Sequence, residues 1–233
     1  MRVAIAAALA AGTMSLCAHA EDLSGLSWTG PFFGPDLGYE WSKRNSTTHN
    51  SGTGAITGHP VSTTQGPYGG FHGGYDFMLG PRFVAGAELD FNRSGRFKRT
   101  FVYSGTSVTD VTSKSEWLGM LLGRVGYVVP DAPVMLVGEF GLYYSRTRIE
   151  QSQLIGANNN LTAGNADVAH SNTVSLVGGA GIEIRLTTKL AFRTDVLYSQ
   201  SGKSFQTYDR RLLRDETNRI NAHYVQIGMN YRF

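Results

Sequence analysis

Two features that many proteins depend on are scarce in this chain. It has one cysteine among 233 residues, and that residue is Cys17, near the amino terminus. A disulfide framework is therefore excluded, as is thiol chemistry anywhere beyond Cys17. No apolar run approaches the roughly 18 residues that a membrane-spanning helix needs, which excludes a helical membrane protein once the amino-terminal segment is removed.

The amino-terminal segment has the pattern of a secretory signal peptide. Arg2 precedes a short apolar run, and Ala18-His19-Ala20 forms an A-x-A cleavage site. A lipoprotein signal is the alternative for Cys17, but the residue before that cysteine would then be small, and it is Leu16. We predict a signal peptide at 1–20, cleaved after Ala20.

The charge of the chain is small and positive. The formal net charge is +3, and removal of Arg2 with the signal peptide lowers it by one. A basic chain can indicate nucleic-acid binding, but export argues against that partner. We expect no nucleic acid, and regard the phosphates of lipopolysaccharide as the more plausible anionic neighbour.

The final segment, H-Y-V-Q-I-G-M-N-Y-R-F at 223–233, alternates between two faces. Val225, Ile227 and Met229 fall on one side, whereas Gln226 and Asn230 fall on the other. Successive side chains of a strand point to opposite faces, so this pattern predicts a strand with one apolar and one largely polar face.

Seven earlier segments show the same alternation. Their approximate limits are 36–41, 66–78, 83–92, 115–129, 134–147, 173–186 and 190–201. Pro31 and Pro35 precede the first segment, and proline cannot donate to a ladder. We therefore expect firm pairing only from about Asp36, with a bulge or an extended entry before it.

The connections between these segments alternate between long and short. Long polar connections at 43–65, 93–114, 148–172 and 202–220 are separated by short turns at 79–82, 130–133 and 187–189. Outer-membrane barrels have this rhythm, with long extracellular loops and short periplasmic turns. The sequence therefore predicts an all-β fold at 21–233: an eight-stranded, antiparallel, up-and-down transmembrane β-barrel. Residues 100–111 are β-prone and could extend one hairpin above the membrane.

Several motifs, in this order, resemble one family. They are W-T-G-P-F-F-G-P-D-L-G-Y-E-W at 28–41, F-V-A-G-A-E-L-D-F at 83–91, L-G-R-V-G-Y at 122–127, G-A-G-I-E at 179–183 and the closing G-M-N-Y-R-F. This series is similar to the opacity-like, porin-family surface antigens of the Gram-negative outer membrane. The resemblance implies surface antigens, adhesins and, in some members, hemin binding. It also implies that Tyr231 and Phe233 belong to the signal read by the barrel assembly machinery.

The chain departs from the family pattern at two places. Pro35 stands where the family usually has glycine, and Met120 and Leu122 occupy inward positions where the family often has threonine and arginine. An arrangement of interior charges cannot therefore be copied from relatives.

Charged residues recur on the inward face of the predicted strands. An eight-stranded barrel is just wide enough to be filled by side chains, and buried charges must pair. We therefore predict an ion-pair plug, with a gated narrow pore as the alternative. The predicted lumen network comprises Glu88, Asp90, Arg124, Glu139, Glu183, Arg185, Arg193 and Asp195, and Asp36, Glu40, Asp76 and Arg232 share its face.

Aromatic residues lie near the predicted strand ends, where interfacial girdles occur in membrane proteins. The predicted interfacial aromatics are Trp28, Trp41, Trp117, Tyr127 and Tyr144.

Histidine spacing gives little sign of a catalytic or metal site. No H-x-x-x-H pattern occurs, and we predict no catalytic residue, no metal site and no bound cofactor. His49, His59 and His170 lie in predicted loops, where they could contact hemin. His170-Ser171-Asn172 also invites comparison with lipid A deacylases, which carry H-x-S-N. Adjacent strand residues point to opposite faces, so His170 and Ser171 are poorly placed to pair.

Together these patterns predict a non-enzymatic outer-membrane anchor for surface-exposed loops. Its expected partners are outer-membrane lipid and lipopolysaccharide, the barrel assembly machinery, and an extracellular ligand such as hemin bound by the four long loops. The alternatives are a small pore or porin-type channel and, more remotely, a lipid A-modifying enzyme.

Overall fold

The computed structural model describes residues 27–50, 56–58, 61–95, 97–104, 107–157, 160–201 and 214–233, so the signal peptide predicted at 1–20 lies outside the described residues. The regular elements are β-strands. Within these ranges, no helix is long and apolar enough to cross a membrane. The strands are β1 (Gly30–Asn50), β2 (Ile56–Gly58), β3 (Val61–Met78), β4 (Phe83–Ser94), β5 (Phe97–Ser104), β6 (Ser107–Val128), β7 (Val134–Ala157), β8 (Asn160–Arg185), β9 (Leu190–Gln200) and β10 (Arg214–Arg232).

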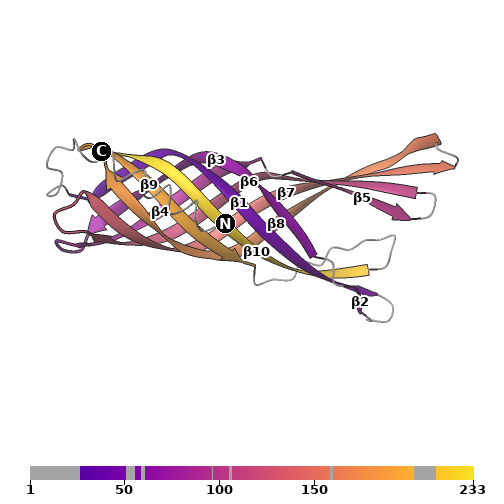
Figure 1. The fold of residues 1–233 in the computed structure, drawn as a ribbon, viewed down its shortest axis with the longest axis horizontal. Coiled ribbons are helices and arrows are strands. Elements are labelled where there is room, and N and C mark those ends of the chain that lie inside the picture. Colours follow the sequence, from indigo (N-terminus) through magenta and orange to yellow (C-terminus); the bar gives the residue numbers. More distant parts are fainter. Residues whose placement is uncertain are drawn as a thin grey trace, which may run out of the picture.

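Eight of these strands close into one antiparallel ring (Figure 1). The order is β10-β9-β8-β7-β6-β4-β3-β1, and β10 pairs again with β1. The other two strands lie outside the ring, because β2 pairs with β1 and β5 pairs with β6. The predicted eight-stranded barrel is confirmed.

Short turns connect the strands at one end of the barrel. They lie at 79–82, 129–133 and 186–189, close to the predicted limits. Two of them contain a residue with positive φ, Gly80 at 142° and Asp131 at 56°, which tight turns often require. The carboxy terminus lies at this same end (Figure 1).

The barrel is apolar outside and polar inside. Along β7, for example, Phe140 is 65% exposed and its neighbour Glu139 only 4%. Leu89, Leu121 and Val125 are also exposed on the outer face, which would be an unusually large apolar patch in water. Hydrocarbon is the solvent that suits such a wall.

Pairing begins earlier in β1 than the prolines suggested. Gly30 and Pro31 already pair with Asp76 and Tyr75 of β3. The register with β10 is the same before and after Pro35, because Phe32 pairs with Arg232 and Asp36 with Gly228. The predicted bulge at the entry to this strand is wrong. Pro35 pairs with Phe71 in a continuous ladder with β3, whereas the ladder with β10 skips Gly34 and Pro35 and resumes in the same register at Asp36.

The long connections are more regular than predicted. Loops were expected at 43–65, 93–114 and 148–172, but β1, β3, β5, β6, β7 and β8 extend over most of those residues. In the fourth connection, 214–220 belongs to β10, and 202–213 lies outside the described residues. The extension of the second hairpin is confirmed, since Phe97–Ser104 pairs with residues 107–114.

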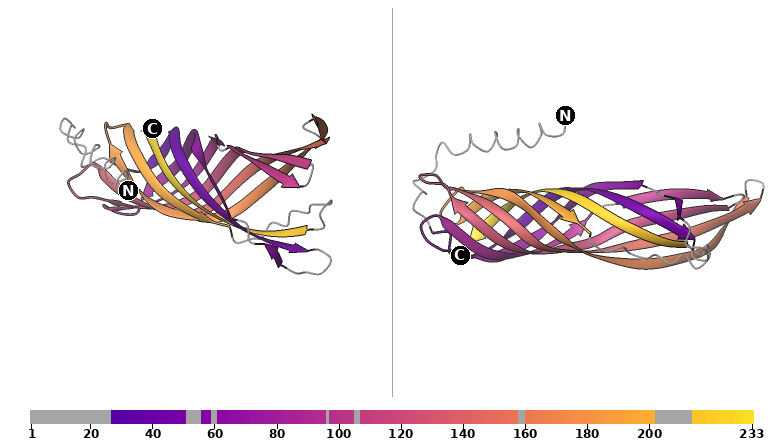
Figure 2. Two further views of the ribbon diagram at one scale, coloured as in Figure 1. Left: turned by 45° about the vertical axis from the view of Figure 1, so that its right-hand side comes forward. Right: turned by 90° about the horizontal axis from the view of Figure 1, so that it is seen from below.

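These extensions form two arms that diverge beyond the barrel (Figure 2). The large arm consists of β5 with residues 107–114, 148–157 and 160–170, and the small arm consists of 44–50, β2 and 214–220. A strand crosses a membrane with about 9–11 residues. Since β8 has 26 residues, more than half of it projects past the membrane.

A test of the outer wall follows from this arrangement. The change Phe140→Arg places a guanidinium near the centre of the apolar band, so we expect a loss of roughly 2–4 kcal/mol in the free energy of unfolding. The control is Thr63→Arg, at an exposed position near the small arm. Urea unfolding in lipid vesicles measures both changes. Equal stabilities of the two variants would contradict a lipid-facing position for Phe140.

Candidate functional site

The inward residues of the barrel form successive layers along its axis. Leaving the short turns, β6 presents Val128, Arg124 and then Leu122, and β9 presents Arg193, Asp195 and then Leu197. An apolar floor is therefore followed by a charge layer and a second apolar layer. The charge layer comprises Asp76, Glu88, Arg124, Glu139, Glu183, Arg193, Asp195 and Arg232.

The floor is built around Trp28. This residue is only 2% exposed and packs in one cluster with Val84, Val128, Met135 and Val137. The guanidinium groups of Arg185 and Arg232 lie 4.7 and 5.0 Å from the centre of its ring. Trp28 therefore closes the short-turn end of the lumen.

Two of the predicted assignments are corrected by this floor. Trp28 does not lie on the outer face with the interfacial aromatics, because its side chain is buried just before β1 begins, whereas Ser27 and Thr29 are exposed. Arg185 is buried but does not join the acids. It donates hydrogen bonds of 2.6 Å to the backbone oxygens of Thr188 and Ser27, and so it ties a turn to the floor.

Arg193 is the centre of one half of the charge layer. Its side chain is 1% exposed and donates to Asp195 at 2.7 Å, to Glu88 at 2.6 Å and to Glu139 at 3.3 Å. These acids come from β9, β4 and β7, so one guanidinium links three strands. An uncompensated buried charge costs several kcal/mol, and this network avoids that cost for Arg193.

Arg124 and Arg232 form the other half and share acids with each other. Arg124 lies 2.9 Å from Glu183 and 3.1 Å from Glu88. Arg232 donates to Glu183 and Asp76, each at 2.8 Å. Of the eight predicted network residues, Glu88, Arg124, Glu139, Glu183, Arg193 and Asp195 thus meet in one layer, and Asp76 and Arg232 join them. Their role, structural or gating, stays a prediction.

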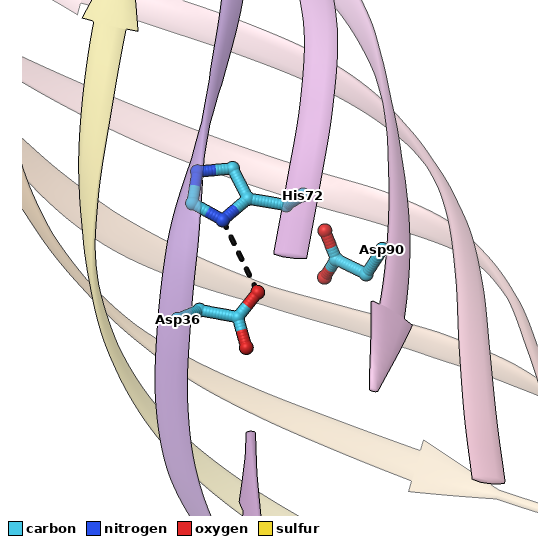
Figure 3. A group of neighbouring side chains, drawn as sticks. All are labelled: Asp36, His72 and Asp90. Carbon is cyan, nitrogen blue, oxygen red and sulfur yellow. Dashed lines mark hydrogen bonds and ion pairs between the residues drawn. The ribbon is translucent and has the colours of Figure 1, made fainter. Parts of the chain in front are cut away.

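A second polar group lies beside this layer and was not predicted as a unit (Figure 3). Asp36 of β1, His72 of β3 and Asp90 of β4 are all buried, and one ligand atom from each lies within 4.8 Å of the others. His72 Nδ1 is 3.1 Å from Asp36 Oδ2, and its Nε2 hydrogen-bonds with Asn230 Oδ1. We call these three residues the Asp–His cluster.

The signal for this cluster lay in the strand register. His72 pairs directly with Asp90, and Asp36 pairs with Gly70, the preceding inward position of β3. Asp36 and Asp90 were on the predicted inward face, but the offset between strands was needed to bring them together with His72. A search for histidine spacing within one segment could not find them.

An apolar septum closes the lumen above the charges. It spans six strands and contains Tyr68, Leu118, Met120, Leu122, Tyr143, Val177, Leu197, Ala222 and Tyr224. The rings of Tyr68 and Tyr224 meet edge to face at 6.1 Å, and Tyr68 donates to Gln226 at 2.9 Å. Met120 and Leu122, which depart from the family pattern, belong to this septum. They were the only signal of it in the sequence.

A shallow cup lies above the septum at the base of the arms. Its lining includes the hydroxyl groups of Ser42, Ser145, Thr173, Ser175 and Ser199, and its volume is about 50 Å³. That volume holds a few waters. A larger hollow of about 610 Å³ lies on the outer wall, between Val125, Leu136, Phe192 and Val196, where lipid chains would contact it.

Glycines make room for the large interior side chains. A Cβ at Gly38 would lie 2.2 Å from the Tyr68 ring, and one at Gly181 would lie 2.0 Å from the Asp195 carboxylate. Real Cβ atoms do not approach other atoms so closely. The large side chains of the septum and of the charge layer therefore fit only because the residue beside each of them on the neighbouring strand is glycine.

Four predicted interfacial aromatics lie on the outer face. Trp117 packs against Tyr144 at 5.0 Å near the long-strand end, where Trp41 also lies, and Tyr127 packs against Phe83 near the short turns. Their interfacial role, like the assembly role of Tyr231 and Phe233, stays a prediction. The last two lie 5.1 Å apart, with Phe233 76% exposed.

Comparison with known proteins identifies similar chains. The family of the outer membrane protein beta-barrel domain matches residues 4–233. The 31 kDa outer-membrane immunogenic protein of Brucella melitensis is 27% identical over 213 residues, which cover 89% of this chain and 84% of the relative. The 25 kDa outer-membrane immunogenic protein of Brucella abortus is 27% identical over 208 residues, with 89% and 80% covered.

Solved structures with a similar arrangement are also membrane barrels. The outer membrane protein OprG of Pseudomonas aeruginosa has a TM-score of 0.49 and 16% identity, covering 91% of this chain and 99% of its own. Ail, the attachment invasion locus protein of Yersinia pestis, has a TM-score of 0.41 and 14% identity, with 88% and 99% covered.

The charge layer predicts a large effect for one substitution. The change Arg193→Leu leaves Glu88, Glu139 and Asp195 without their shared partner, so we expect a loss of about 3–5 kcal/mol in the free energy of unfolding. The control is Arg82→Leu, in an exposed turn, which should change stability by less than about 0.5 kcal/mol. Urea titration compares the two, and equal midpoints would rule out a stabilising network.

Proposed function

Because the chain belongs to the outer membrane protein beta-barrel domain family and lies in the bacterial outer membrane, we propose that it is a closed, non-enzymatic anchor whose two arms act in recognition outside the cell. This role is that of a surface antigen or adhesin-like protein. The observation that supports it is the presence of two buried apolar clusters in the lumen, the Trp28 floor and the septum, beneath two long arms. A barrel that does not conduct solutes would act mainly through the partners that its arms bind.

The layers inside the barrel support a closed anchor over a pore. An ion crossing the lumen would meet the septum, the charge layer and the Trp28 floor in turn. The septum presents buried, largely apolar side chains from six strands, which favours exclusion of water and ions. A substitution in the charge layer alone would therefore leave the lumen blocked by the septum. In a gated pore, by contrast, the same substitution would raise conductance.

The arms supply the surface for a partner. Their strands carry mostly polar sequence, such as K-R-N-S-T-T-H-N at 43–50 and N-L-T-A-G-N-A-D at 160–167. Paired strands hold such residues in a fixed order, which favours a defined recognition surface. Hemin is one candidate ligand, since His49 lies in β1 and His170 in β8, while His59 lies outside the described residues.

Basic residues just above the aromatic girdle favour contact with lipopolysaccharide. Arg93 and Arg146 pair in the sheet with Trp117, and Lys43 lies two residues beyond Trp41. Lys43 and Arg93 are exposed, and Arg146 is half-exposed beside Glu116. Phosphate groups at the membrane surface suit such positions. We include lipopolysaccharide among the proposed partners on this ground.

Export and assembly complete the proposal. We propose that residues 1–20 are removed as a signal peptide and that the C-terminal strand, with Tyr231 and Phe233, is read by the barrel assembly machinery. An enzyme of the lipid A deacylase kind is not favoured, since His170 and Ser171 are adjacent positions of one strand, β8. The names of the immunogenic relatives also carry no enzymatic activity.

Conductance tests the closed lumen. In planar bilayers we expect no single-channel steps from the folded protein, and none from Arg124→Ala, because the septum remains. Combining Arg124→Ala with Leu118→Gly, Tyr224→Gly and Trp28→Gly should produce steps, since the charge layer, the septum and the floor are then all breached. Discrete steps from the wild type or from Arg124→Ala alone would contradict the anchor and support the porin-type alternative.

Deletion of the β7–β8 hairpin, one of the two hairpins of the large arm, tests the role of this arm in recognition. Arg148 pairs with His170, so residues 149–169 can be replaced by Asn-Gly, a turn that suits two antiparallel strands. We expect the barrel to fold, shown by its heat-dependent mobility on a denaturing gel, while binding of cells to host surfaces or hemin falls to background. Unchanged binding would place recognition elsewhere.

A further inference from the structure

We infer that Asp36, His72 and Asp90 form a buried site for one divalent transition-metal ion. The three side chains come from the neighbouring strands β1, β3 and β4 and converge on one space inside the barrel (Figure 3). Their ligand atoms already lie within 4.8 Å of one another. Small side-chain rotations bring such atoms to the separations found around a single ion.

The surroundings of His72 favour a metal at Nδ1. Its Nε2 hydrogen-bonds with Asn230 Oδ1, which accepts a proton and so favours the tautomer protonated at Nε2. In this tautomer the Nδ1 lone pair faces Asp36 Oδ2 at 3.1 Å. Two acceptors at that separation repel each other unless a cation or a proton lies between them. Metal-binding histidines commonly donate their other ring N–H to such an oxygen.

The buried carboxylate of Asp90 provides a second, independent reason to expect a bound cation. Asp90 is 4% exposed, its carboxylate oxygens accept no hydrogen bond from an N–H or hydroxyl donor in the described residues, and the side chain within hydrogen-bond reach of it is another acid, Glu88. Oδ1 of Asp36 and Oδ1 of the fully buried Asn92 also lack a hydrogen-bond donor, and Nδ2 of Asn92 lacks an acceptor. Such a concentration of bare oxygens is costly in a protein interior, and a cation removes the cost.

The total charge of the lumen agrees with this inference. Acids outnumber arginines among the buried described residues, eight to four: Asp36, Glu40, Asp76, Glu88, Asp90, Glu139, Glu183 and Asp195 against Arg124, Arg185, Arg193 and Arg232. Within the described residues, these arginines form ion pairs and hydrogen bonds with other acids and with backbone oxygens, and none of these contacts goes to Asp36 or Asp90. A divalent ion would supply positive charge where it is missing.

The donor set indicates the class of metal. One imidazole nitrogen with two carboxylates suits Zn²⁺, Mn²⁺, Fe²⁺ or Co²⁺ better than Mg²⁺ or Ca²⁺, which prefer oxygen ligands alone. Gly70 pairs with Asp36 on one side and with Asn92 on the other, and Asn92 Oδ1 lies close to Gly70. This oxygen is a further candidate ligand. The site lies between the septum and the charge layer, so the ion would enter as the barrel folds.

Refolding with metal tests the site. The protein is folded in detergent micelles with EDTA or with excess Zn²⁺, passed through a desalting column and analysed for zinc by atomic emission. We expect one zinc per folded chain and a higher unfolding temperature than with EDTA. Folding with Co²⁺ should give an absorption band near that of tetrahedral or five-coordinate cobalt, whereas Mg²⁺ should give no stabilisation.

Matched variants assign the metal to these residues. Asp90→Asn and His72→Gln keep side-chain volume and should weaken zinc binding by roughly 100-fold or more. The controls, Asp195→Asn in the charge layer and His223→Gln on the outer face, should retain one zinc. Asp90→Asn removes a bare charge, so it should fold in EDTA at least as well as the wild type, which separates lost binding from lost folding.

Two results would overturn the inference. One is folded wild-type protein that holds no zinc or cobalt after desalting, which would mean that protons alone neutralise the carboxylates. The other is equal metal content in the wild type and the Asp36→Asn, His72→Gln, Asp90→Asn triple variant, which would place the ion elsewhere.

Discussion

Closure of the ladder between β1 and β10 is the constraint on which the rest of the molecule depends. Inside a membrane, each backbone N–H and C=O must find a partner in the protein, and a sheet provides one for each only when its strands close into a ring without edges. The same requirement explains why the prolines of β1 are tolerated. Their register is held from both sides by β3 and β10, so a missing donor does not shift the strand.

A ring of eight strands leaves a narrow interior, and polar side chains must fill it. Charges cannot reach water there, which is why single arginines serve several acids. Arg193 joins acids from three strands, and Arg232 connects the last strand to the floor through the Trp28 backbone. The apolar septum then separates this polar interior from the solvent between the arms. Interior and exterior have thus exchanged the roles that they have in a soluble protein.

Strand alternation predicted the fold and the inward position of the buried acids and arginines, because a period of two depends on local sequence alone. Which inward residues meet depends on the offset between strands. Glu88 and Arg193 lie 105 positions apart, and no local pattern links them. The same offset hid the Asp–His cluster and the septum. Trp28 was misplaced because it precedes the first strand, where alternation carries no information.

The polar connections were misread for a different reason. Polar sequence is typical of loops, yet a strand leaving the membrane can continue its ladder with a neighbour at little cost. The Trp28 floor, in turn, bears on the order of assembly. Its backbone oxygen accepts a hydrogen bond from Arg232, 204 positions later and next to the last residue. The residues around Trp28 can therefore form this contact only after β10 is in place. The floor would thus be completed late in folding, although it lies early in the sequence.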